Sequence, residues 1–298
     1  MEQKNDQNPL EYPGTWAINE PERVAIIMTG SGEKMTYLEL DEKSNRIANL
    51  FVGLGLNHGD HIAFCLENTI DFLPLAWGAH YAGLYYTAIS SRLTDEEMSY
   101  IVKDCGARIF ITSVGIRDTA EQINFADTTV QEKFAIGGEL DGYTSFEDAI
   151  KSTDKEPKSG RVEGQDMLYS SGTTGLPKGV KVKAPDVPLG SPSPQAMLFR
   201  AVFGIDADAV YLSPAPLYHA APLRFCMAAH RIGATVVVME KFDPEGALAA
   251  IETNGVTASQ WVPTMFVRML KLPEEVREKY DTTSLKTVIH LLLPVQLR

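Results

Sequence analysis

The chain has 298 residues, of which 44% are hydrophobic and 22% are charged. This is the composition of a globular protein with enough apolar material for a large core. Its 27 Lys and Arg against 39 Asp and Glu leave a net charge of −12, which argues against nucleic acid or an anionic membrane as a partner.

Helical and strand patterns alternate from residue 36 onward. Thr36 and Thr94 each stand three residues before a glutamate, which is the spacing of a capping box. Gly55 and Gly106 would end the two helices that follow. The predicted helices are 37–54, 72–82, 95–105 and a short one at 145–150, and the predicted strands are 61–66, 84–89 and 108–112. This order predicts a parallel, doubly wound α/β sheet, with the rest of residues 114–164 unassigned.

A second series of strands and helices follows an irregular connection. Residues 184–194 contain four prolines and one glycine, which is typical of a loop. Beyond this loop, the predicted strands are 209–212 and 234–239, and the predicted helices are 244–253 and 263–270. We therefore expect a second α/β sheet packed beside the first.

Cysteine and histidine spacing gives no sign of a metal site. Cys65, Cys105 and Cys226 lie far apart, as in a reduced protein, and His58 and His61 are read as part of a solvated turn. The polar N-terminal residues do not resemble a signal peptide, and no apolar run is long enough to span a bilayer. We expect a cytoplasmic protein without a transmembrane segment.

The segment 169–179, Tyr-Ser-Ser-Gly-Thr-Thr-Gly-Leu-Pro-Lys-Gly, has the residue types that bind phosphate. Its hydroxyl groups are short donors, its glycines let backbone N–H groups approach closely, and Lys178 adds a positive charge. A Walker loop is excluded, because Pro177 and Gly179 stand where that motif needs Gly and Ser or Thr. The alternation in residues 180–183 favours a strand–loop–strand arrangement. In isolation, a Ser- and Gly-rich surface turn would be the alternative.

The segment resembles the signature of the AMP-dependent synthetases and ligases, the adenylate-forming enzymes. Residues 36–54, 59–63 and 93–104, Asn68 with Phe72, and the stretch Pro214-Ala215-Pro216-Leu217-Tyr218-His219 are similar to further motifs of that family. The similarity reaches to about His290, and the chain looks most like a bacterial acyl-CoA synthetase.

This resemblance implies the N-terminal α/β domain of the adenylate-forming enzymes, with two packed doubly wound sheets in αβαβα layers. Residues 48–200 would form the first subdomain with the phosphate segment, and residues 1–47 with 201–298 part of the second. The family's Tyr-Gly-x-Thr-Glu and Thr-Gly-Asp motifs and its C-terminal lysine do not occur here. We therefore expect a truncated chain without the C-terminal lid domain, and a frameshift or premature stop at residues 291–298.

By the same resemblance, the protein would activate a carboxylic acid, expected to be a fatty acid, with ATP and Mg²⁺, and pass the acyl group from the adenylate to coenzyme A. The phosphates would be held by Ser170, Ser171, Gly172, Thr173, Thr174, Gly175 and Lys178. Lys178 and Thr174 would be the catalytic residues. His219 and Tyr218 would line the acyl pocket, although outside this family His219 would be read as a half-buried histidine and Tyr218 as a core aromatic residue.

Two other functions share these features. One is a catalytically incomplete remnant that binds a nucleotide or an acyl group. The other is an adenylation domain that serves another acceptor, such as a carrier protein.

Overall fold

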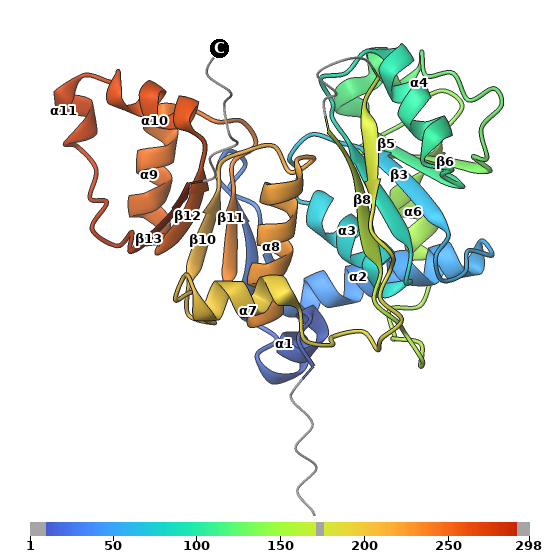
Figure 1. Ribbon diagram of the computed structural model, residues 1–298, viewed down its shortest axis with the longest axis horizontal. Helices are drawn as coiled ribbons and strands as arrows, with labels where there is room; N and C mark the ends of the chain where they lie inside the picture. Colours follow the sequence, from blue (N-terminus) through green and yellow to red (C-terminus); the bar gives the residue numbers. More distant parts are fainter. Residues whose placement is uncertain (1–9, 171–175, 291–298) are drawn as a thin grey trace, which may run out of the picture.

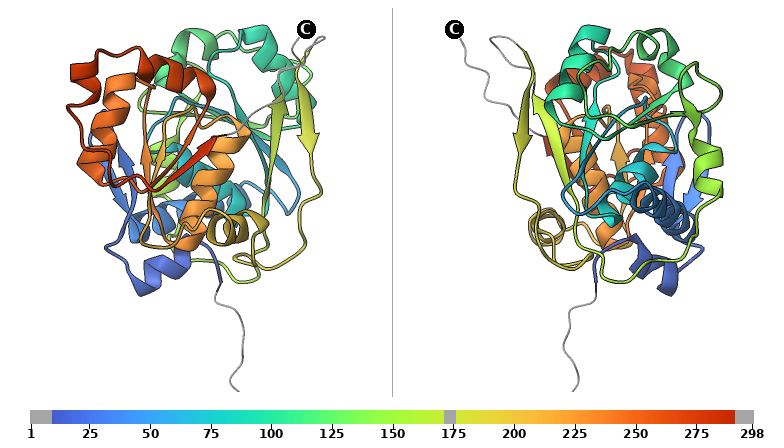
Figure 2. Two further views of the ribbon diagram at one scale, coloured as in Figure 1. Left: turned by 60° about the vertical axis from the view of Figure 1, so that its left-hand side comes forward. Right: turned by 90° about the vertical axis from the view of Figure 1, so that its right-hand side faces the viewer.

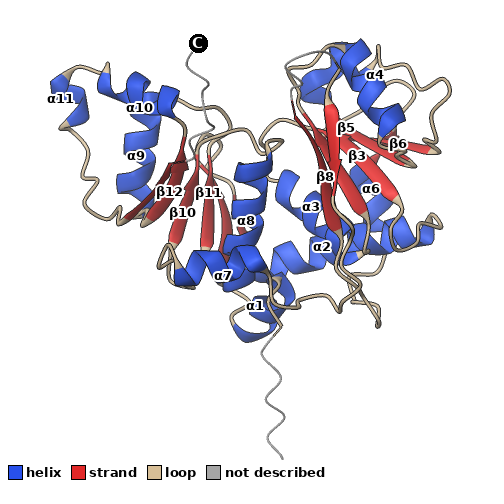
Figure 3. Cartoon of the chain, viewed as in Figure 1, coloured by secondary structure: helices blue, strands red, loops and turns tan. Residues whose placement is uncertain are grey.

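The computed structural model describes residues 10–170 and 176–290, which form two β-sheets with helices between and outside them (Figures 1 and 3). The first sheet has the order β7-β6-β5-β3-β4-β8-β9. Its strands are β3 (His61–Cys65), β4 (Tyr85–Ile89), β5 (Ile109–Ser113), β6 (Glu132–Ile136), β7 (Thr144–Ser145), β8 (Gln165–Ser170) and β9 (Lys178–Lys181).

The second sheet has the order β13-β12-β10-β11-β1-β2. Its strands are β1 (Val24–Met28), β2 (Lys34–Thr36), β10 (Val210–Ser213), β11 (Thr235–Val238), β12 (Ala258–Trp261) and β13 (Thr287–His290). Strands from both ends of the described chain therefore share one sheet, because β1 pairs in parallel with β11.

The helices form three layers around these sheets. They are α1 (Pro13–Asn19), α2 (Tyr37–Gly53), α3 (Phe72–Tyr81), α4 (Asp95–Asp104), α5 (Arg117–Ala120), α6 (Phe146–Lys151), α7 (Pro194–Ala201), α8 (Ala220–Ile232), α9 (Pro244–Asn254), α10 (Pro263–Leu270) and α11 (Glu274–Arg277). Helices α2, α3 and α8 lie between the sheets, α4 covers the outer face of the first sheet, and α9 and α10 cover the outer face of the second (Figure 1). The predicted α/β layers are confirmed.

Helix α3 shows why the middle layer holds together. Every residue from Phe72 to Tyr81 is buried, as expected for a helix that is apolar on all sides and has neighbours all round. Trp77 donates a hydrogen bond from Nε1 to Nδ1 of His230 on α8 (3.1 Å), and Nε2 of His230 is bonded to the carbonyl of Ala25 in β1 (3.1 Å). The core is thus continuous from one sheet to the other.

The two predicted capping boxes are confirmed. Thr36 and Glu39 exchange bonds at the start of α2, and Thr94 and Glu97 do so at the start of α4. Each pair satisfies backbone donors that the first turn of a helix leaves without partners.

The strands from which a parallel sheet was predicted, β3, β4 and β5, do pair in parallel, and antiparallel pairing is added at two places. β2 is antiparallel to β1, and β9 is antiparallel to β8. In both pairs a short connection reverses the chain, whereas a parallel neighbour needs a long crossover. Strand β6, in the unassigned residues 114–164, was also missed, as were α1, β1, β2, α7, α8 and β12.

No helix in the described ranges is long and apolar enough to cross a membrane. The proposed subdomain division at residues 47 and 200 stays a prediction. Helix α2 runs through the first of these boundaries without a break.

Candidate functional site

The phosphate segment joins β8 to β9 at one edge of the first sheet. The two strands pair as an antiparallel hairpin, with Ser170 opposite Lys178 and Tyr169 opposite Gly179. Gly179 leaves room for the side chains of β8, because a Cβ at this position would stand 2.7 Å from the Met167 methyl group and 2.8 Å from the Tyr169 ring. The predicted strand–loop–strand arrangement is therefore confirmed, although β9 begins at Lys178 and ends at Lys181.

The open end of this hairpin presents the two described residues of the predicted phosphate site. Ser170 and Lys178 are both exposed, while Pro177 beside them is buried. The other predicted phosphate ligands, Ser171, Gly172, Thr173, Thr174 and Gly175, lie outside the described residues. Strand pairing thus places a hydroxyl and an ammonium group side by side at the carboxyl end of β8, an arrangement suited to phosphate oxygens.

The predicted acyl-site residues lie in the loop between β10 and α8. His219 is the N-cap residue of α8, and its ring centroid is 4.5 Å from that of Tyr218. Burial, and the positive charge of Arg92, lower the pKa of His219. The imidazole is therefore neutral at neutral pH.

Asn68, just after β3, holds this loop in place. Its Nδ2 donates to the carbonyls of Met239 (2.8 Å) and Ala215 (3.2 Å), and its Oδ1 accepts from the backbone N–H of Leu217 (2.8 Å). The Asn68 side chain is buried, so these bonds are not in competition with water. One amide thereby ties the first sheet to two loops of the second.

Both parts of the predicted site lie at the same edge of the molecule. The carboxyl end of β8 and the beginning of α8 are both at the top of Figure 1. Carboxyl ends of strands are the usual place for ligands in open α/β sheets. Within the described residues, no side-chain hydrogen bond joins Ser170 or Lys178 to Tyr218 or His219.

The structure also contains a buried polar cluster that the sequence analysis missed. We call His80, Glu163 and Arg231 the buried cluster; each is at most 7% exposed. Arg231 donates from Nη1 to Oε1 of Glu163 (3.1 Å) and from Nη2 to Oε2 (2.5 Å), and His80 Nε2 is hydrogen-bonded to the same Oε2. Burial alone would raise the pKa of Glu163, but His80 and Arg231 lower it to about 2.

A second ion pair joins β8 to α8. Arg224 Nε donates to both carboxylate oxygens of Asp166 (3.2 and 3.0 Å), and its Nη2 donates to one of them (2.7 Å). This bond network raises the pKa of Arg224. The Asp166 side chain is 8% exposed and that of Arg224 36%, so the guanidinium reaches solvent.

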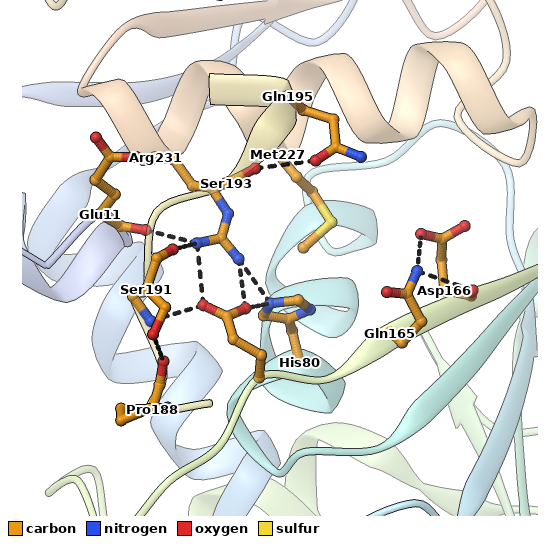
Figure 4. Close-up of polar contacts among 12 residues, drawn as sticks. Glu11, His80, Gln165, Asp166, Pro188, Ser191, Ser193, Gln195, Met227 and Arg231 are labelled. Carbon is orange, nitrogen blue, oxygen red and sulfur yellow. Dashed lines mark hydrogen bonds and ion pairs between the residues drawn. The ribbon is translucent and has the colours of Figure 1, made fainter. Parts of the chain in front are cut away.

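The ion pair and the buried cluster line one cavity of about 180 Å³, which we call the α8 cavity. Figure 4 shows Met227 between His80 and Arg231 on one side and Gln165 and Asp166 on the other. None of the predicted site residues lines it.

The only local sign of these residues in the sequence was polarity in apolar surroundings. Arg231 ends the run Phe-Cys-Met-Ala-Ala-His of α8, and Asp166 precedes the apolar part of β8. Glu163 and Arg231 are 68 positions apart, so their pairing depends on the fold. In the described ranges, no group of three or more His, Cys, Asp or Glu could hold a metal ion.

Comparisons with known proteins show the family and the fold. The sequence matches the family described as AMP-binding enzyme over residues 15–293. It is 28% identical over 271 residues to crotonobetaine/carnitine–CoA ligase of Escherichia fergusonii, covering 86% of this chain and 51% of that protein. It is 27% identical over 274 residues to 4-coumarate–CoA ligase 1 of Solanum tuberosum, covering 90% and 49%.

The fold is similar to the inhibitor-bound N-terminal domain of FACL13 from Mycobacterium tuberculosis, with a TM-score of 0.79 and 23% identity, covering 93% of this chain and 68% of that one. The architecture is thus that of the N-terminal domain of adenylate-forming enzymes. The chain spans about half the length of the curated relatives it matches. The extent of the family match shows that the chain belongs to the AMP-binding enzymes.

Proposed function

We propose that this chain carries the phosphate-binding part of an enzyme that activates a carboxylic acid with ATP and transfers the acyl group to coenzyme A. The observation that carries the proposal is the open end of the β8–β9 hairpin. Ser170 and Lys178 stand opposite each other there, on either side of a segment rich in Ser, Thr and Gly. The relatives named as CoA ligases of crotonobetaine or carnitine and of 4-coumarate support the same reaction class.

The proposed reaction has two steps. A carboxylate oxygen attacks the α-phosphorus of ATP, the bond to the β-phosphate oxygen breaks, and pyrophosphate leaves with that electron pair. The coenzyme A thiol, after losing its proton, then attacks the acyl carbon, and AMP leaves. Such chemistry needs positioning and charge neutralisation more than acid–base groups.

Each described residue of the proposed site has its own role in this reaction. The Lys178 ammonium neutralises negative charge on the outer phosphates, and the Ser170 hydroxyl donates to a phosphate oxygen. His219, kept neutral by its lowered pKa, lines the acyl side of the site and can donate one hydrogen bond to the substrate carboxylate. Tyr218 packs against it and limits how the imidazole turns.

The co-substrates of the proposal are ATP, coenzyme A and the acid. Mg²⁺ would accompany the ATP phosphates, and we assign it no protein ligand among the described residues. A fatty acid as substrate and the cytoplasm as location stay predictions from the sequence.

Exchange of labelled pyrophosphate into ATP, measured with a panel of carboxylic acids, tests the first step directly. Because the family's Tyr-Gly-x-Thr-Glu and Thr-Gly-Asp motifs do not occur in this sequence, we expect exchange that depends on the acid but is slow. Lys178→Ala removes the ammonium group that faces the phosphates and should lower this exchange about a hundredfold, which corresponds to about 2.7 kcal/mol of transition-state stabilisation. Lys183→Ala is the matched control, because Lys183 is exposed just beyond β9.

Three other outcomes would contradict the proposal. ATP binding in calorimetry without exchange for any acid would favour a catalytically incomplete nucleotide-binding protein. Exchange without formation of a coenzyme A thioester would favour adenylation for another acceptor. Equal rates of pyrophosphate exchange in the Lys178→Ala and Lys183→Ala variants would show that the hairpin is not part of the active site.

A further inference from the structure

Arg92 lies in the turn between β4 and α4, just beyond the carboxyl end of β4. Two bonds to Ser90 shape this turn: the backbone N–H of Arg92 donates to Oγ of Ser90 (3.3 Å), and that of Leu93 donates to its carbonyl (3.3 Å). Thr94 follows as the N-cap residue of α4. Arg92 is therefore held between the end of a strand and the start of a helix, which limits the positions that its side chain can reach.

The register of the first sheet brings this turn beside the phosphate segment. β4 and β8 are parallel neighbours, and their pairing includes Tyr86 opposite Asp166. The Thr87 hydroxyl donates to the carbonyl of Met167 (2.8 Å), so the two strands stay together beyond that pair. Counted on in the same register, Ser90 comes level with the end of β8, where the phosphate segment begins. Neighbouring strands are about 4.8 Å apart, so the turn borders that segment.

The same turn also faces the acyl side of the proposed site. The Tyr86 hydroxyl donates to Sδ of Met227 (3.1 Å), so β4 packs against α8, and His219 is the N-cap residue of α8. Burial lowers the pKa of His219, and the positive charge of Arg92 lowers it further. A charge acts in this way on a group that lies close to it. Arg92 thus lies between the two parts of the proposed site.

The guanidinium of Arg92 differs from the other guanidinium groups in residues 10–170 and 176–290. Each of the others has a carboxylate, carbonyl, amide or aromatic-ring partner. In those ranges Arg92 is exposed and has none of these partners. A guanidinium is always charged and matches a carboxylate with two parallel hydrogen bonds. The position of Arg92 therefore offers an anion both charge and a defined orientation.

The proposed adenylation step brings two anions into contact, because the carboxylate and the α-phosphate are both negatively charged. The sheet order β4-β8-β9 places Lys178 on the far side of β8 from Arg92, so the charge of Lys178 serves the phosphates. His219 is neutral and offers the carboxylate a hydrogen bond without a charge. Arg92 supplies a cation on the acyl side, where the carboxylate has to be held against the repulsion of the phosphates.

We infer that Arg92 binds the carboxylate of the acid substrate and holds it beside the α-phosphate, which makes Arg92 a catalytic residue of the adenylation step. This role rests on the proposed function, to which it adds the residue that binds the reacting group. In the step itself, a carboxylate oxygen forms the bond to the α-phosphorus and pyrophosphate leaves with the electron pair. The guanidinium keeps all its protons throughout.

Pyrophosphate exchange at varied acid and varied ATP concentrations tests this role, with the acid that the unaltered chain exchanges fastest. Arg92→Ala should raise the KM for the acid about tenfold or more and change the KM for ATP by less than about twofold, because the lost contact is made to the acid. Arg92→Lys keeps the charge without the paired hydrogen bonds and should fall between the two. Arg277→Ala removes another exposed arginine, on α11, and should match the unaltered chain.

The titration of His219, followed by NMR, tests the position of Arg92 without substrate or turnover. Arg92→Ala removes a nearby positive charge and should raise the pKa of His219 toward its ordinary value. Arg92→Lys and Arg277→Ala should leave that pKa nearly unchanged. The resonance is assigned by its loss in His219→Gln.

Three results would overturn the inference: an increase in the KM for ATP in place of that for the acid, exchange by Arg92→Ala equal to that by Arg277→Ala, or a His219 pKa that Arg92→Ala does not change. The first would place Arg92 on a phosphate. The second would leave the proposed function intact and remove only the role of Arg92.

The proposed function fails separately if the unaltered chain shows no exchange with any acid. Binding of hexanoate, dodecanoate, benzoate and 4-coumarate to the whole chain, followed by ligand-observed NMR, then decides the role of Arg92. Binding that Arg92→Ala loses and Arg92→Lys keeps supports it. Binding that is equal in the Arg92→Ala variant, or no measurable binding of any of these acids, contradicts it.

Discussion

The β8–β9 hairpin and the buried cluster lie at opposite ends of the same strand, and their polar groups are satisfied in different ways. Ser170 and Lys178, where β8 ends, face solvent. Glu163, two residues before β8 begins, is 4% exposed and accepts hydrogen bonds from Gly190, Arg231 and His80. One end of the strand is open to a ligand, and the other is closed by the protein itself.

The two ends of β8 differ in what their polar groups can contact: the exposed groups can meet a ligand, and the buried groups meet only other parts of the protein. A ligand can reach exposed donors without breaking any protein contact, so we expect the hairpin end to contribute little to folding. A buried carboxylate can stay charged only while its partners hold it, so the cluster ties together the elements from which they come. Those elements are α3 and α8, which lie in the layer between the two sheets.

The largest loss of stability should come from removing one charged partner of the buried cluster. Arg231→Met leaves Glu163 buried without its cation, and we expect a loss of about 3 to 5 kcal/mol in the free energy of unfolding, measured with urea. The double variant with Glu163→Met should lose less, because no unpaired charge remains. Arg200→Met removes an exposed ion pair and should cost about 1 kcal/mol or less. Equal losses for Arg231→Met and Arg200→Met would contradict the comparison.

Acid pH should weaken the same layer in a defined window. Burial lowers the pKa of His230 to about 4, whereas in the unfolded chain it is about 6.5. The unfolded state therefore takes up a proton first, and stability falls as the pH drops from about 6.5 to 4, with a slope of up to about 1.4 kcal/mol per pH unit for this proton.

His230→Gln should remove that contribution from the slope of unfolding free energy against pH. The pKa of His61 is also lowered to about 4, by burial and by Lys181, but His61 is only half-buried. His61→Gln should therefore flatten the slope less. A slope that His230→Gln leaves unchanged would rule out this origin of acid sensitivity.

The smallest effect on stability should come from the hairpin. Lys178→Ala changes an exposed side chain, and we expect the free energy of unfolding to change by no more than about 0.5 kcal/mol. Thermal unfolding followed by circular dichroism measures this. A loss above about 1 kcal/mol would mean that Lys178 is part of the structure, and the loss of pyrophosphate exchange in that variant would then need another explanation.

Local signals predicted much of the fold. The capping boxes at Thr36 and Thr94 appear in the sequence because their bonds join residues three apart. The antiparallel direction of β9 follows from the short segment between it and β8, because a parallel neighbour would need a long crossover. Strand β6 was missed since Glu132 and Lys133 begin it, and its buried part is only three residues long.

The candidate site, too, could be predicted from the sequence only in part. The segment proposed to bind phosphate stood out because phosphate binding needs several small donors within one loop; of its residues, Ser170 and Lys178 lie opposite each other in the structure. The residues of the α8 cavity come from separate elements. Arg224 and Asp166 are 58 positions apart, and no local pattern connects them. Only the packing of α8 against the first sheet brings them together.

Strand β9 forms one border of the first sheet, and Figure 2 shows it beside β8 at the margin of the molecule. Such borders can recruit a strand from another molecule and start aggregation. Val180 and Val182 are 53% and 50% exposed there, but Lys181 and Lys183 alternate with them and Lys178 lies two residues before Val180. Repulsion between these ammonium groups discourages two copies from stacking along this border. The lysine proposed to hold phosphate therefore also helps to keep the molecules apart.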